Sequence, residues 1–374
     1  MNSYFFLLNQ IEMPNLELDD DNDEEEEFDK KNRMDIEKED FNDNMGQIEI
    51  KLENYSNIET ITELIKKEGK EDLQKFTVVD YIGRGSESLV FKIRLNGTNN
   101  YYVLKVMKKH KNKSNYSELL ISRKIKHKNI ANTLCYYVDS KYKFDYIIME
   151  LGNSNLINFS RKVLKRATLS EDFLCMATYH VLQGLAYLHK CKIAHLDIKP
   201  QNIIITDYLD TKLIDFSVSL DYSQMKGQEI NLPYAGTAYM MSPEIIMRQK
   251  IKIRDLQKVD LFSLGVTIYV LAFGHYPFEF TKGDDDEAIY SKINSGWKVT
   301  DEDNNFSNHF INFLNGLLES DINKRLNIRE CLNHYWVQGA QILLNEKENT
   351  YNANSFLSYL ITSHFRSFEE YISH

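Results

Sequence analysis

The octet His195-Leu196-Asp197-Ile198-Lys199-Pro200-Gln201-Asn202 is the stretch of sequence that decides the fold. An apolar run at helical spacing, from Phe173 to His189, precedes it, and three β-branched residues, Ile203 to Ile205, follow it. This pattern predicts a loop held between a buried helix and a strand, a place where catalytic groups are common.

The octet combines an acid, a base and an amide. Asp197 and Lys199 stand two residues apart in an extended loop, so their side chains can face one site. The amide oxygen of Asn202 is a suitable ligand for a hard cation such as Mg²⁺. On the octet alone, an ion pair within a loop explains Asp197 and Lys199 as well as a catalytic site does, and the rest of the chain has to decide.

Composition limits the class of protein. The 374 residues are 43% hydrophobic and 27% charged, enough for one large domain or two ordinary ones. The four cysteines include no Cys-x-x-Cys pair, so neither a disulfide framework nor a zinc site is predicted. The run from Tyr4 to Leu8 is too short for a signal peptide, and Leu264 to Phe273 is predicted to be a buried helix. We expect a cytoplasmic protein, with the nucleus as an alternative.

Negative charge is concentrated near the N-terminus. Residues 12–43 hold 16 acids and 4 bases, so the remainder of the chain is about +2. The run from Asp19 to Glu27 repels itself and predicts a disordered acidic tail over residues 1–56, either a solvating tail or a docking arm for a basic partner. A linker over residues 57–75 follows. It contains a predicted short helix with one apolar face, made of Ile58, Ile61, Leu64 and Ile65.

From Phe76 the pattern predicts three antiparallel strands, over 76–82, 89–93 and 101–106. Gly83 and Gly85 between the first two suit a backbone that approaches a phosphate, although a plain hairpin has the same pattern. Lys105 alternates with apolar neighbours, so its buried ammonium needs a partner. Glu118, at the start of the next predicted helix, can supply that partner.

With these residues in place, the chain resembles the catalytic domain of a eukaryotic protein kinase of the serine/threonine type over residues 76–336. The matching motifs stand in the family's order: Gly83, Gly85 and Val90; Lys105, Glu118 and His127; Asp197, Lys199 and Asn202; Asp215-Phe216-Ser217; Gly236-Thr237 and Ser242-Pro243-Glu244; Asp260 and Gly265; Arg325; His334-Tyr335-Trp336. The resemblance implies an α+β bilobal fold. A small, mainly antiparallel β lobe with one helix would cover 76–151, and a larger α-helical lobe would cover 152–336.

The resemblance also implies residue roles, with ATP and Mg²⁺ as cofactors. Asp197 would accept the proton of the substrate hydroxyl, Lys199 would neutralise charge on the γ-phosphoryl group, and the Lys105–Glu118 pair would hold the phosphates. Asn202 and Asp215 would be the metal ligands. The implied nucleotide-binding residues are Ile82, Gly83, Gly85, Val90, Val103, Lys105, Met149 as the gatekeeper, Glu150 through its carbonyl, Gly152 through its amide, and Ile204.

The expected function is therefore that of a serine/threonine protein kinase. The main alternative is a pseudokinase that acts as a binding or scaffold module, and a small-molecule kinase is a distant third. Lys199 with Thr237 resembles the serine/threonine-specific pattern. The segments Gly274–Phe278 and His334–Trp336 are weakly similar to the calcium/calmodulin-dependent kinase group.

The chain departs from the family pattern at five positions. Ser88 replaces the third glycine of the loop, Val103 replaces a small residue, and Ser217 replaces the glycine after Phe216, but no catalytic group is lost. Leu196 stands where the family has an arginine that receives an activation-segment phosphate, and Pro233 stands where the phosphoacceptor is usual. Both changes predict activity that does not depend on phosphorylation there.

The expected partner is a protein substrate with a serine or threonine acceptor, and neither nucleic acid nor a membrane. Lys108–Lys113 lacks interleaved aromatic residues, so a solvated loop is favoured over a nucleic-acid patch. Asp284–Glu287 could attract basic peptides, but a solvated loop is favoured here too. In the helical tail at 337–374, an apolar face from Phe356 to Phe368 is expected to dock on the large lobe. Calmodulin binding is not predicted, because Glu369 and Glu370 oppose Arg366.

Overall fold

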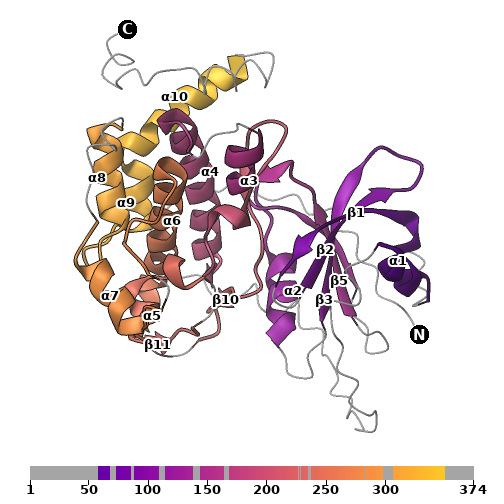
Figure 1. Ribbon diagram of the computed structural model, residues 1–374, viewed down its shortest axis with the longest axis horizontal. Helices are drawn as coiled ribbons and strands as arrows, with labels where there is room; N and C mark the ends of the chain where they lie inside the picture. The colour runs from indigo at the N-terminus through magenta and orange to yellow at the C-terminus, as the bar shows by residue number, and fades with distance from the viewer. Residues whose placement is uncertain are drawn as a thin grey trace, which may run out of the picture.

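The computed structural model describes residues 58–67, 73–85, 88–108, 114–137, 144–163, 168–225, 227, 229–234, 237–281, 283–297 and 306–349. A smaller lobe built on a sheet lies beside a larger, mainly helical lobe, which confirms the predicted α+β bilobal fold (Figure 1). The acidic tail at 1–56, residues 109–113 of the basic run, Gly236 and the apolar segment from Phe356 to Phe368 lie outside the described residues.

The small lobe contains a five-stranded antiparallel sheet in the order β1-β2-β3-β5-β4. Its strands are β1 (Phe76–Arg84), β2 (Ser88–Leu95), β3 (Tyr101–Lys108), β4 (Thr133–Tyr137) and β5 (Phe144–Glu150). Because successive side chains of a strand point to opposite faces, Leu104 and Val106 enter the core on one face, while Val103 and Lys105 face the other. The three predicted strands at the start of the lobe are confirmed.

Two helices cover opposite faces of this sheet. The apolar residues of α1 (Ile58–Lys67) share a buried core with Leu104. On the other face, Leu119 of α2 (Ser114–Lys124) packs on Met107. The helix predicted in the linker is therefore part of the small-lobe core.

The position of Glu118 within its helix differs from the prediction. The sequence suggested that Glu118 opens the helix, whereas α2 begins at Ser114. Glu118 consequently lies in the second turn, where its backbone is fixed by helical hydrogen bonds on both sides.

The large lobe is built around α4 (Glu171–Lys190) and α6 (Leu256–Phe273), which pack on each other. Ser170 caps α4 by accepting a hydrogen bond from the Phe173 amide. The other helical elements of this lobe are α3 (Leu156–Asn158), the π turn η3 (Phe159–Val163), η4 (Pro200–Asn202), η5 (Ala238–Met240), α5 (Pro243–Ile246), η6 (Ile253–Asp255), α7 (Asp286–Asn294), α8 (Asn308–Leu317), α9 (Ile328–Asn333) and α10 (Tyr335–Asn349).

Helix α6 is the centre of the large-lobe core. A side chain at Gly265 would place its Cβ 2.8 Å from the Cβ of Leu317, so glycine lets α8 approach closely. Residues 253–273 are long and apolar enough to cross a membrane, but 78% of their most apolar window is buried inside the protein. That burial is the property of a core helix, and it agrees with the prediction for Leu264–Phe273.

Short strands position the loops at the junction of the lobes. β6 (Ser154–Asn155), β8 (Ile203–Ile205) and β9 (Thr211–Leu213) form one small sheet. β7 (Ile193–Ala194) pairs with β10 (Leu220–Asp221), and β11 (Glu229–Asn231) pairs with β12 (Lys250–Lys252). The octet at 195–202 therefore lies between α4 with β7 on one side and β8 on the other, as the sequence predicted.

Helix α10 crosses the predicted end of the domain. It starts at Tyr335 and continues to Asn349, and its residues Val337, Ala340 and Leu343 are buried in the large-lobe core. The predicted boundary at residue 336 thus falls inside a helix, because the apolar face that begins at Trp336 continues along α10.

Candidate active site

The loop that contains Asp197 is held by a buried carboxylate. Asp260 of α6 is fully buried, and its Oδ2 lies 2.8 Å from Nε2 of His189 and accepts a hydrogen bond from the His195 amide at 3.0 Å. Its Oδ1 accepts from the Leu196 amide at 2.8 Å. Burial by itself would raise the pKa of Asp260, but His189 and the amides outweigh it and lower the pKa. An ionised Asp260 therefore fixes the start of the loop.

The backbone is left-handed at two positions of this site. Leu196 has φ 63° and Asp215 has φ 68°, a conformation that costs a residue with a Cβ about 1–2 kcal/mol. Hydrogen bonds hold both positions, since the Leu196 amide binds Asp260 and the Asp215 carboxylate accepts from the Ser217 amide at 3.3 Å. Strain of this kind is found where the fold must aim a particular side chain.

Asp197 has one oxygen in use and one free. Its Oδ2 lies 2.6 Å from Nζ of Lys199 and accepts from Nδ2 of Asn202 at 2.8 Å. Its Oδ1 is buried and has no hydrogen-bond partner among the described residues. A buried acceptor without a partner is costly, so this oxygen is suited to a ligand hydroxyl.

Lys105 joins the two lobes. Its Nζ lies 2.5 Å from Oε1 of Glu118 in the small lobe and 2.8 Å from Oδ1 of Asp215 in the large lobe. Burial would lower the pKa of Lys105, but the two carboxylates raise it above its ordinary value. Burial also opposes the charge on Asp215, yet Lys105 lowers the pKa of Asp215 to about 2. The ammonium and the Asp215 carboxylate are therefore both charged at neutral pH.

Asn202 and Asp215 fit a magnesium ion that also uses ligand phosphates. Nδ2 of Asn202 donates to the carbonyl and to the carboxylate of Asp197, which leaves the amide oxygen for a metal. Lys105 and the Ser217 amide both bind Oδ1 of Asp215, and no described residue binds Oδ2, which can therefore bind a metal. Within the described part of the chain no cluster of three or more His, Cys, Asp or Glu could hold a metal. Mg²⁺ commonly takes one or two protein ligands plus phosphate oxygens and water, a number that Asn202 and Asp215 can supply.

The residues predicted to bind a nucleotide meet at the junction of the lobes. In the small lobe, Val90 lies opposite Lys105 in the sheet register, and Val103 lies opposite Met149. Gly152 adjoins Ile204 of the large lobe, where a Cβ on the glycine would come within 2.8 Å of the isoleucine side chain.

The Gly-rich tip and its neighbour fit the same assignment. The Gly85 amide donates to the Ser88 carbonyl at 2.9 Å, which closes the tip. A Cβ on Gly83 would meet nothing within 4 Å, so that backbone lies open to a ligand. Ile82 is 50% exposed beside it.

The segment from Glu150 to Gly152 is fixed by a contact that the sequence did not predict. The Glu150 carboxylate lies 2.6 Å from Nζ of Lys212 and accepts from the Asn132 amide at 3.1 Å. The Gly152 amide makes no hydrogen bond among the described residues and can bind a nucleotide base. Lys212 lies between Thr211 and Leu213 in β9, a strand of three residues that is too short to give a periodic signal in the sequence.

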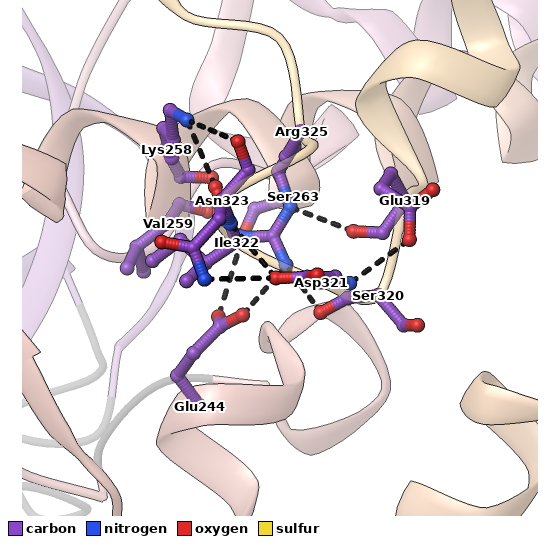
Figure 2. A network of polar contacts seen from close by, with 10 residues as sticks. All are labelled: Glu244, Lys258, Val259, Ser263, Glu319, Ser320, Asp321, Ile322, Asn323 and Arg325. Carbon is purple, nitrogen blue, oxygen red and sulfur yellow. Dashed lines mark hydrogen bonds and ion pairs between the residues drawn. The ribbon is translucent and has the colours of Figure 1, made fainter.

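Lys199 also reaches the activation segment, which is the stretch between Asp215 and Glu244. Its Nζ donates to Oγ1 of Thr237 at 3.3 Å, so the lysine bridges the catalytic loop and the residue before η5. The end of the segment is held by Glu244, which pairs with Arg325 at 2.7 Å. Figure 2 shows the Arg325 guanidinium between Glu244 and the carbonyls of Glu319 and Ser320.

The acidic run at 284–287 is largely used within the fold. Asp284 lies 2.7 Å from Nζ of Lys292, and Asp285 caps α7 by accepting from the Ala288 amide. Asp286 pairs with Arg248 at 2.7 Å. These contacts favour a structural role over the capture of basic peptides.

Comparisons with known proteins agree with this geometry. The family description "Protein kinase domain" matches residues 76–337. The chain is 30% identical over 277 residues to the "MAP kinase kinase MKK1/SSP32" of Saccharomyces cerevisiae, a match that covers 69% of this chain and 52% of that protein. It is 31% identical over 212 residues to the "Serine/threonine-protein kinase mig-15" of Caenorhabditis elegans, covering 54% of this chain and 19% of that one.

The chain thus spans about half the length of the first relative and about a fifth of the second. Neither relative is named as a calcium/calmodulin-dependent kinase, so that resemblance stays a prediction.

Proposed function

The chain belongs to the protein kinase family, and on that premise we propose that it transfers the γ-phosphoryl group of ATP to serine and threonine hydroxyls of protein substrates. The observation that carries the proposal is the connected set of charges in which Lys105 contacts both Glu118 and Asp215, while Asp197 keeps one buried oxygen free. Phosphoryl transfer requires mainly positioning and charge neutralisation, and this set supplies both.

Each residue has a task that its contacts explain. Oδ1 of Asp197 receives the proton of the attacking hydroxyl, and Lys199 lies 2.6 Å from Oδ2, beside the transferring group. Lys105 binds phosphate oxygens while Glu118 fixes its direction. Asn202 and Asp215 would hold Mg²⁺, which when bound neutralises negative charge on the phosphates.

The proposed acceptors are serine and threonine. The contact between Lys199 and Thr237 places the catalytic loop against the segment that precedes η5, which agrees with the serine/threonine pattern seen in the sequence. Phosphorylation of an oriented peptide library tests the proposal, because it reports both the acceptor and its neighbours. We expect label on serine and threonine; label confined to tyrosine would refute this part of the proposal.

The alternative function is that of a pseudokinase scaffold. Pseudokinases have usually lost a catalytic group, whereas Lys105, Glu118, Asp197, Asn202 and Asp215 are all present here. Lys105 contacts Glu118 and Asp215, and Asn202 contacts Asp197. The intact set favours the enzyme.

We further propose that activity does not depend on a phosphate in the activation segment. Leu196 is 6% exposed and packs in the large-lobe core, so the position where the family pattern has a phosphate-binding arginine is apolar here. Ser219 and Tyr222 are buried, with hydroxyls directed to the carbonyls of His195 and His189. The pairing of β11 with β12 supports the segment instead.

Phosphatase treatment tests this second proposal. The dephosphorylated protein should keep its transfer rate, with mass spectrometry confirming that residues 216–241 carry no phosphate. A loss of activity that maps to that segment would refute the independence while leaving the kinase assignment in place.

A further inference from the structure

The position of α2 decides whether Glu118 can reach Lys105, because Glu118 is a residue of that helix. The helix packs on both lobes: Leu119 contacts the small-lobe residues Met107 and Ile147, whereas Ile121 belongs to the large-lobe core, as does Ile125 just after the helix. Apolar packing of this kind has little directional preference, so polar contacts at the helix end can fix its orientation.

The last turn of α2 carries two neighbouring cations with partners in different lobes. The guanidinium of Arg123 lies 5.0 Å from the ring centre of Tyr136 in β4. Nζ of Lys124 lies 2.6 Å from Oδ2 of Asp221 in β10. Both charges also suit the negative end of the helix dipole. Among the described residues, Lys124–Asp221 is the ion pair that joins α2 itself to the activation segment.

Asp221 is prepared for this contact. Its Oδ1 accepts from the amide of Ser223 at 3.0 Å and from the Ser223 hydroxyl at 2.6 Å, so the carboxylate is oriented with Oδ2 toward Lys124. Although burial opposes the charge, these bonds and Lys124 lower the pKa of Asp221. A carboxylate held in one orientation loses less freedom on pairing than a mobile one.

Asp221 also lies beside the strand that leads into the catalytic loop. Its strand β10 pairs with β7, where Asp221 lies opposite Ile193, two residues before His195. On the α2 side, Lys124 is six residues from Glu118 on one rigid helix. The ion pair therefore connects the residue that orients Lys105 with the strand that precedes Asp197.

We propose that Asp221 is a positioning residue that, through Lys124, holds α2 against the activation segment and keeps Glu118 in contact with Lys105. This inference rests on the proposed function. Lys124 and Asp221 are both unmodified side chains, so this ion pair forms without an added phosphate. Its strength should depend on ionic strength, because Lys124 is 55% exposed.

The test uses charge-neutralising variants of the full chain. Asp221→Asn keeps an oxygen that can accept from Ser223, and Lys124→Met keeps the length of the side chain, so each removes the ion pair with little other change. We expect each variant to lower kcat/KM for ATP by about two- to five-fold, the range of an exposed ion pair. The double variant Lys124→Met/Asp221→Asn should lose no more than either single variant.

Two further measurements separate positioning from a general loss of stability. Amide hydrogen exchange over Glu118–Lys124 should accelerate in both single variants while exchange in α4 stays unchanged. The charge-swapped double variant Lys124→Asp/Asp221→Lys should restore the amide hydrogen exchange rate of the wild type and at least half of the lost kcat/KM. Lys126→Glu serves as the control, because its exposed side chain has no ion pair among the described residues.

The proposal would be overturned if amide hydrogen exchange in α2 were as slow in both single variants as in the wild type. It would also be overturned if the losses in kcat/KM of the single variants added up in the double variant. The exchange measurement decides even if the wild type proves to transfer no phosphate. In that case amide hydrogen exchange alone tests whether Asp221 holds α2 against β10, independently of the proposed function.

Discussion

Asp260 is the residue on which the arrangement of the catalytic loop depends most. It is fully buried, and its hydrogen bonds with the amides of His195 and Leu196 hold the start of the loop to α6. Its negative charge is maintained by those donors and by His189 rather than by water.

We predict that Asp260→Asn lowers the free energy of unfolding at pH 7 by about 3 kcal/mol, because the new amide group would face N–H donors in the core. The carboxylate's pKa is lowered in the folded protein, so its contribution is complete above the ordinary value of 3.8 and is lost as the pH falls below it. Denaturant unfolding should therefore show a constant gap between wild type and variant from pH 7 to about 4, and a narrowing gap below.

The exposed Glu279→Gln is the control for this experiment and should leave stability within about 0.5 kcal/mol of wild type. A gap that is absent at pH 7, or that does not narrow in acid, would contradict the role given to Asp260.

Arg325 is a second residue whose substitution should lower the stability of the large lobe. The side chain is 1% exposed, and its five N–H donors bind both oxygens of Glu244 and the carbonyls of Lys258, Glu319 and Ser320 (Figure 2).

We predict that Arg325→Lys lowers the free energy of unfolding by about 3–5 kcal/mol, because an ammonium cannot replace the bidentate contact and leaves Glu244 poorly compensated. Chemical denaturation monitored by fluorescence measures this loss. Arg329→Lys, an exposed arginine with no ion pair among the described residues, should change stability by less than about 0.5 kcal/mol. Equal stability of the two variants would show that the hydrogen bonds of Arg325 do not contribute this much to the free energy of unfolding.

Among the elements, α1 has the clearest structural role outside the catalytic set. It closes the face of the small-lobe sheet that is opposite α2, and Ile61 is fully buried there.

We predict that Ile61→Ala destabilises the protein by about 2–4 kcal/mol, through lost burial and the cavity left in the core. Glu63→Ala, on the exposed side of the same helix, should have little effect. The two variants are compared by thermal unfolding. Similar melting temperatures would mean that α1 is an appendage rather than part of the core.

The elements also show how far the sequence could be read. β1 to β3 were predictable because apolar residues alternate over several positions and turns separate them. The β11–β12 pair was not, since each strand has three residues and its partner lies about twenty residues away. Such short patterns carry no periodic signal, and their pairing depends on tertiary packing.

The candidate site divides in the same way. Lys105, Glu118, Asp197, Asn202 and Asp215 could be named from motif order. In the structure Lys105 contacts Glu118 and Asp215, and Asn202 contacts Asp197. The ion pairs Lys212–Glu150 and Lys124–Asp221 could not be predicted, because each joins segments far apart in the chain without a motif around them.

At the scale of the whole molecule, ion pairs between charged side chains join the two lobes in addition to apolar packing. Lys105 carries one contact from β3 to Asp215, and Lys124 carries another from α2 to β10. The contact of Lys105 with both Glu118 and Asp215 therefore requires that the two lobes are correctly placed relative to each other.

The central claim is that this constellation transfers a phosphoryl group. The most direct measurement is single-turnover transfer from radiolabelled ATP with Mg²⁺ to a generic basic protein, using phosphatase-treated wild type and Asp197→Asn. We predict label transfer by the wild type and a rate lower by about 10²–10⁴-fold in the variant, because the variant lacks the proton acceptor. If both proteins bind nucleotide and are equally silent, the chain is a scaffold and the account is wrong.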